Sequence, residues 1–140
     1  MKPELSQVLV MSGMQLPGVA AATSYAQGSA GLITGLMMMA AEEHDRAAEV
    51  RVAENARMRA LFKSLGAKVK DAALRGELET AATSKDPGLR ISALNTANAD
   101  LRKLLIALQT AMEDAADRDA QKQIWAHLQK TSEERMLKLG

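Results

Sequence analysis

The sequence predicts an all-α protein, an antiparallel helical bundle of four main helices with room for a short extra helix at the N-terminus. Residue types supply the first reason: alanine, leucine and methionine form helices readily, and aromatic residues make up only 2% of the chain. Apolar spacing supplies the second, since several stretches place apolar residues three and four apart, the period of an amphipathic helix. We treat residues 1–140 as a single domain, because the length is ordinary and no low-complexity linker divides the chain.

Glycine, proline and helix-capping residues set the expected helix boundaries. A turn at "QLPG" ends the short first helix, and Gly66 suits the end of the long second one. Asp86 can cap the fourth helix, with Pro87 at its first position. The expected helices span residues 4–14, 20–65, 68–83, 87–115 and 118–138.

The helix expected at 87–115 has the strongest apolar pattern. Its inward positions are Ile91, Leu94, Asn98, Leu101, Leu105, Leu108, Met112 and Ala115. The one polar member, Asn98, is expected to be buried and paired, since an asparagine in an apolar seam usually fixes register. The flanking positions are apolar rather than charged, so this pattern predicts a globular bundle and not a two-stranded zipper.

The seam of the long helix is apolar at both ends and polar in the middle, where it carries His44, Arg51 and Asn55. The ordinary interpretation of His44 is a packed histidine with a hydrogen-bonding partner. The more specific interpretation is a contact that responds to pH. Together with Asn98, these residues form the expected polar core, or a polar pocket for a small molecule or cofactor.

Residues 5–41 contain no charged residue, whereas 42–140 read as charged amphipathic helices. A membrane span is not expected, because polar residues interrupt the uncharged segment and positive flanks are missing. The segment must still be covered, so we expect it to contact a second copy of this chain or another helical protein. The candidate partner-binding residues are Gly28, Gly31, Ile33, Gly35, Leu36, Met37 and Met38.

Composition narrows the function by exclusion. Eighteen Lys and Arg against seventeen Asp and Glu leave no basic excess to attract nucleic acid. There is no cysteine, and neither histidine has a carboxylate at helical spacing, so we expect no metal site. No catalytic residue or cofactor is expected either, and the absence of cysteine agrees with a cytoplasmic protein.

Residues 42–112 resemble the FlgN-type flagellar export chaperones. The resemblance rests on "EEHDRAAEVRVAENARMRALF" and on "ALNTANADLRKLL", whose Asn95 and Asn98 match an Asn-x-x-Asn pattern. It implies a helical protein that binds amphipathic helices of export substrates without catalysis. No binding residue is carried over, and neither the uncharged segment nor the C-terminal tail has a counterpart.

The function expected from the sequence is a non-catalytic protein–protein interaction module that self-associates through its uncharged N-terminal helix. Three alternatives stay open. They are a chaperone-like binder of amphipathic helices, a small-molecule or cofactor-binding protein using His44, Arg51 and Asn55, and a peripheral membrane protein using residues 19–41.

Overall fold

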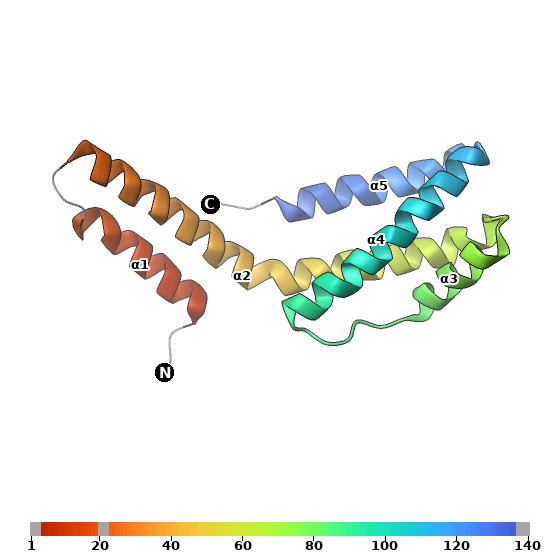
Figure 1. Cartoon of the computed structure of the whole chain (residues 1–140), viewed down its shortest axis with the longest axis horizontal. Helices are drawn as coiled ribbons and strands as arrows, with labels where there is room; N and C mark the ends of the chain where they lie inside the picture. The colour runs from red at the N-terminus through yellow and green to blue at the C-terminus, as the bar shows by residue number, and fades with distance from the viewer. Residues whose placement is uncertain (1–3, 20–22, 137–140) are drawn as a thin grey trace. The chain divides into compact units, whose positions relative to one another are not determined.

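The structure, a computed structural model, describes residues 4–19 and 23–136 and confirms the all-α class. These residues form five α-helices and one short 3₁₀ helix, and contain no strand. Figure 1 labels the α-helices in chain order. They are α1 (Leu5–Val19), α2 (Ser24–Leu65), α3 (Ala72–Thr83), α4 (Ile91–Asp114) and α5 (Arg118–Arg135), with the 3₁₀ turn at Gly66–Lys68.

The described residues fall into two compact units, and the boundary lies within α2, between Ala47 and Ala48. The N-terminal unit holds α1 and the first part of α2, and the C-terminal unit extends to Met136. Whether the two units act as the single domain expected from the sequence stays a prediction.

In the N-terminal unit, α1 packs against α2 at Gly13. A Cβ at Gly13 would lie 3.4 Å from the Cβ of Met37 and 3.6 Å from Thr34, so a larger side chain would push the helices apart. The Thr34 hydroxyl lies 2.8 Å from the Gly13 carbonyl and 2.8 Å from the Ala30 carbonyl, and its single proton serves both acceptors. Close packing at Gly13 and the hydrogen bond from Thr34 therefore hold α1 and α2 together.

The turn expected at "QLPG" is wrong, because α1 continues through Pro17 to Val19. Proline has no N–H to donate to the carbonyl four residues earlier, which is that of Gly13. Thr34 supplies a hydrogen bond to this carbonyl from the neighbouring helix, so the helix tolerates the proline. α2 is continuous from Ser24 to Leu65, including Gly28, Gly31 and Gly35.

The C-terminal unit has its own apolar core, to which the second part of α2 and all three later helices contribute. Figure 1 shows α4 beside both α3 and α5, which are its packing partners. The buried core residues are Met58, Phe62, Leu65, Val69, Leu78, Ala81, Leu101, Leu105, Leu108, Met112, Ala120 and Ile124. The seam expected on α4 is buried from Leu94 to Met112, whereas its first residue, Ile91, and its last, Ala115 at the C-cap, are exposed.

Local hydrogen bonds define the ends of the later helices. The carboxylates of Asp71 and Asp117 cap α3 and α5 by accepting from backbone N–H groups at 2.9 Å. α4 ends in a Schellman motif, in which Asp117 N–H donates to the Met112 carbonyl and Ala116 N–H to that of Glu113. Ala116 adopts φ = 53°, the left-handed conformation that glycine usually supplies there.

The expected start of the fourth helix at Asp86 and Pro87 is wrong, because α4 begins at Ile91 after Arg90. The Asp86 carboxylate does not cap a helix. It accepts hydrogen bonds from Asn55 at 2.9 Å and from Arg59 at 2.7 Å. None of the described helices has the length and apolarity needed to cross a lipid bilayer.

Candidate interaction surface

α1 exposes several large apolar side chains. Ser6 and Gly13 are buried, while Leu5, Val8, Met11 and Met14 are between 40% and 65% exposed. A spacing of three falls short of the helical turn of about 3.6 residues, so these four residues wind around α1 and do not share one side. The buried residues of α1 are therefore small, whereas its large apolar residues are either exposed or, at Leu9, Val10 and Leu16, partly buried.

α2 likewise buries small residues and exposes large apolar ones in the N-terminal unit. Its buried positions there are small: Ala30, Ala41 and Ala47. Its exposed residues include Tyr25, Leu32, Leu36 and Met39, with Leu32 at 74% and Leu36 at 65% exposure. Their spacing of seven, four and three residues places all four on one stripe, which we call the α2 stripe.

The three glycines among the candidate partner-binding residues lie open in this unit. A Cβ added at Gly28, Gly31 or Gly35 would meet nothing within 4 Å among the described residues. The glycine at which two helices do approach closely is Gly13, which the sequence reasoning missed. The glycines of α2 are therefore not used for packing within the described chain.

The structure places the other candidate partner-binding residues on two sides of α2. Ile33, Leu36 and Met38 are exposed, whereas Met37 is partly buried beside Gly13. Sequence reasoning missed the other exposed stripe residues, Tyr25, Leu32 and Met39. Their spacing from one another and from Leu36, of seven, four and three residues, could have predicted this stripe. Sequence reasoning considered the run of three methionines instead.

The expected polar core is split between the two units. Arg51, Asn55 and Asn98 lie in the C-terminal unit, and Asn98 is buried and paired, as predicted. His44 belongs to the N-terminal unit and is exposed, so the interpretation of it as a packed histidine is wrong. The buried residues at this level of α2 are Ala41 and Ala47.

Asn55 and Asn98 belong to a continuous chain of polar contacts, which we call the Asn55 network. Asp86 accepts from the Asn55 amide, and Asn55 Oδ1 accepts from the Asn98 amide at 2.9 Å. Asn98 Oδ1 in turn accepts from Arg135 Nη2 at 3.2 Å. The network thus connects α2, α4, α5 and the segment before α4.

The network ends at Glu54, whose carboxylate is almost fully buried. Arg135 donates to it through three contacts of 2.7 to 3.0 Å, and Arg51 lies 3.8 Å away. Arg51 also donates to Asn95 Oδ1 at 2.7 Å. Because these groups satisfy one another, their arrangement is that of a polar core and offers few free groups to a cofactor.

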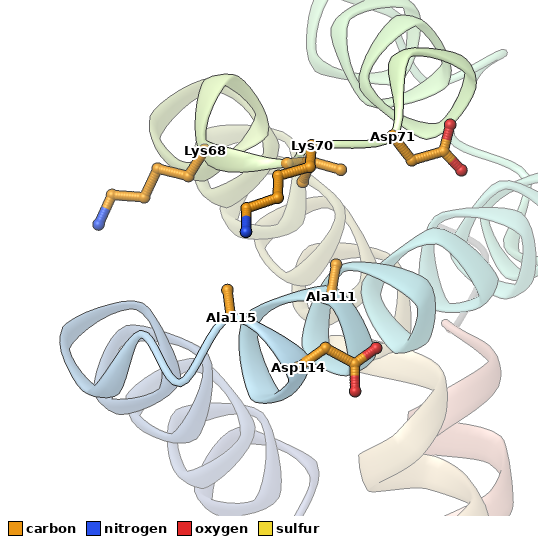
Figure 2. Close-up of a pocket in the computed structure, with 7 residues that line it drawn as sticks. Lys68, Lys70, Asp71, Ala111, Asp114 and Ala115 are labelled. Carbon is orange, nitrogen blue, oxygen red and sulfur yellow. The ribbon is translucent and has the colours of Figure 1, made fainter.

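A small pocket lies beside the 3₁₀ turn and the end of α4, with a volume of about 210 Å³ (Figure 2). Lys68 and Lys70 extend toward one end of it, while the carboxylates of Asp71 and Asp114 point toward the other. Lys68 Nζ donates to Asp117 at 2.8 Å, and this hydrogen bond lowers the pKa of Asp117. The polar groups do not converge, and the pocket is smaller than usual ligand sites of roughly 300–1,000 Å³.

Among residues 4–19 and 23–136, no three histidine, cysteine or carboxylate side chains are grouped closely enough to hold a metal ion. The strongest candidate for function is therefore the apolar surface of the N-terminal unit. Comparison of the chain with protein-family models, curated proteins and solved structures finds no match.

Proposed function

We propose that the protein is a non-catalytic interaction module and that its N-terminal unit binds a second copy of the same chain. The observation that carries this proposal is the exposure of several large apolar side chains on α1 and α2, whose buried residues in this unit are small. Burying one such side chain stabilises an assembly by about 1.5–3 kcal/mol relative to exposure. Contiguous apolar surface of this kind marks an interaction site in most proteins.

The spacing of the α2 stripe favours a helical partner. Tyr25, Leu32, Leu36 and Met39 follow the seam pattern by which helices pack along one another. Residues 5–41 carry no charge, so two copies of this surface would not repel each other. Gly28, Gly31 and Gly35 lie open, which would let a partner backbone approach closely.

The C-terminal unit would act as the scaffold for this surface. We propose that the second part of α2 forms an antiparallel four-helix bundle with α3, α4 and α5. All four contribute to one apolar core, and short connections join them. The absence of cysteine fits the cytoplasmic setting that we propose for the assembly.

The test is the light-scattering mass of the protein over a dilution series. Leu36→Glu places a charge on the α2 stripe, and we expect it to shift the mass toward the monomer. Ile106→Glu is the matched control, because Ile106 is 66% exposed against 65% for Leu36 but lies on α4 in the C-terminal unit. We expect Ile106→Glu to assemble like the wild type.

A wild type that stays monomeric at every concentration would contradict self-association. Binding of a synthetic amphipathic helix by such a monomer, lost in Leu36→Glu, would instead support the chaperone-like alternative suggested by the FlgN-type resemblance. Co-sedimentation of the monomer with lipid vesicles, lost in the same variant, would support the peripheral membrane alternative.

A further inference from the structure

A groove in the C-terminal unit lies between the second part of α2 and α5. This groove is widely open to solvent and has a volume of about 540 Å³, within the usual range of roughly 300–1,000 Å³ for small-molecule sites. Its lining residues are Arg57, Ala60, Leu61 and Ser64 from α2 and Gln123, Ala126, His127 and Lys130 from α5.

Arg57 and Lys130 give the groove a positive charge that their shared partner does not fully neutralise. Arg57 Nη2 lies 2.6 Å from Glu134 Oε2, an ion pair whose angles are not those of a hydrogen bond. Lys130 Nζ lies 3.7 Å from the other oxygen of the same carboxylate. Two cations thus face one anion, and Arg57 Nε is buried without a hydrogen-bond partner among the described residues.

His127 supplies a second unused polar group. Its side chain is only 6% exposed, and Nδ1 has no hydrogen-bond partner within the described part of the chain. Burial and the nearby charge of Arg57 lower the pKa of His127, so the ring is neutral at neutral pH. A buried polar atom without a partner is unusual in a folded protein and is readily satisfied by a bound molecule.

The rest of the lining is mainly apolar and includes Ala60, Leu61 and Ala126. Such a combination suits a ligand with a hydrocarbon part and a single negative charge. A dianion such as phosphate would exceed the one positive charge that remains and would gain nothing from the apolar lining.

We propose that this groove binds a small organic monocarboxylate. Its carboxylate accepts hydrogen bonds from Arg57, His127 and Lys130, and its hydrocarbon chain lies over Ala60, Leu61 and Ala126. Charge-assisted hydrogen bonds to a carboxylate fix its position, while the apolar contact supplies much of the affinity.

The test is a titration of the full chain with hexanoate, followed by NMR of the His127 ring. We expect saturable shifts with a dissociation constant on the order of 1 mM, a value ordinary for so small a ligand. Hexan-1-ol and hexylammonium serve as probes of the same length without a negative charge. Both should bind on the order of tenfold more weakly or not at all.

Two variants test the location of the ligand. Lys130→Gln removes a cation at an exposed position and should weaken hexanoate binding about tenfold. Ala126→Phe fills the groove from an exposed position and should abolish binding. Ala99→Phe makes the same change at an exposed position of α4 and should leave binding unchanged.

Three results would overturn the proposal. One is the absence of saturable shifts at tenfold the expected dissociation constant. Another is hexan-1-ol binding as tightly as hexanoate, which would show that the carboxylate is not recognised. The last is Ala126→Phe binding hexanoate like the wild type, which would place the ligand elsewhere.

Discussion

Replacing Arg135 with methionine tests whether the buried carboxylate of Glu54 depends on its ion pair. The Glu54 side chain is 2% exposed and receives three contacts of 2.7 to 3.0 Å from Arg135. Removing one partner of a fully buried pair costs about 3–5 kcal/mol, because the remaining charge stays buried. Here Arg135 is 32% exposed and Arg51 offers a second cation at 3.8 Å. We therefore expect a smaller loss, about 2–3 kcal/mol of unfolding free energy.

Urea unfolding followed by the helical circular dichroism signal measures this loss. Lys122→Met is the control, since it removes a cation from the same helix at a 79% exposed side chain and should change stability by less than about 0.5 kcal/mol. Glu54→Met combined with Arg135→Met should be more stable than Arg135→Met alone, because no unpaired charge then remains buried. Equal losses in Arg135→Met and Lys122→Met, or a double variant less stable than Arg135→Met, would refute the reasoning.

Two further predictions concern the Schellman motif and His127. Ala116→Gly should raise the unfolding free energy by about 0.5–1 kcal/mol, because glycine adopts the φ of 53° without strain. Ala115→Gly is the control and should lower the unfolding free energy, because Ala115 has an ordinary φ of −78°. Thermal melting of both variants checks the difference. Because the pKa of His127 is lowered in the folded protein, the unfolded chain takes up a proton at a higher pH than the folded chain does. The contribution of His127 to stability should therefore be complete above pH 6.5, the ordinary pKa of histidine, and should fall as the pH drops toward the lowered pKa. Urea unfolding at a series of pH values should show this fall in the wild type and in His44→Gln but a smaller one in His127→Gln, and equal falls in all three proteins would count against it. The charged residues that act on His127 are Arg57, Glu54, Arg102 and Glu134.

Repeating patterns within one helix were predictable from the sequence. The three-four spacing of α4 places Leu94, Asn98 and Met112 in the core, where the structure has them. Ile91 satisfies the same spacing but is exposed at the first turn, because a periodic pattern does not tell where its helix begins. Periodicity alone therefore identifies a face and leaves its limits open.

Contacts between distant parts of the chain were not predictable. Asp86 has the residue type of a helix cap, but it pairs with Arg59 and Asn55 instead, which precede it by 27 and 31 residues. The exposed side of the N-terminal unit was also only partly foreseen. Met37 belongs to the methionine run by sequence, yet the approach of α1 at Gly13 partly covers it and leaves Leu36 outside.

The hydrogen bond that Thr34 donates to the carbonyl of Gly13 has a consequence for the evolution of this chain. Pro17 leaves that carbonyl without its usual donor, and the hydroxyl of Thr34 compensates from the neighbouring helix. A related sequence with another residue at position 17 would regain the backbone N–H and would no longer need a hydroxyl at position 34. Positions 17 and 34 should therefore covary, with proline at the first retained only where the second is threonine or serine.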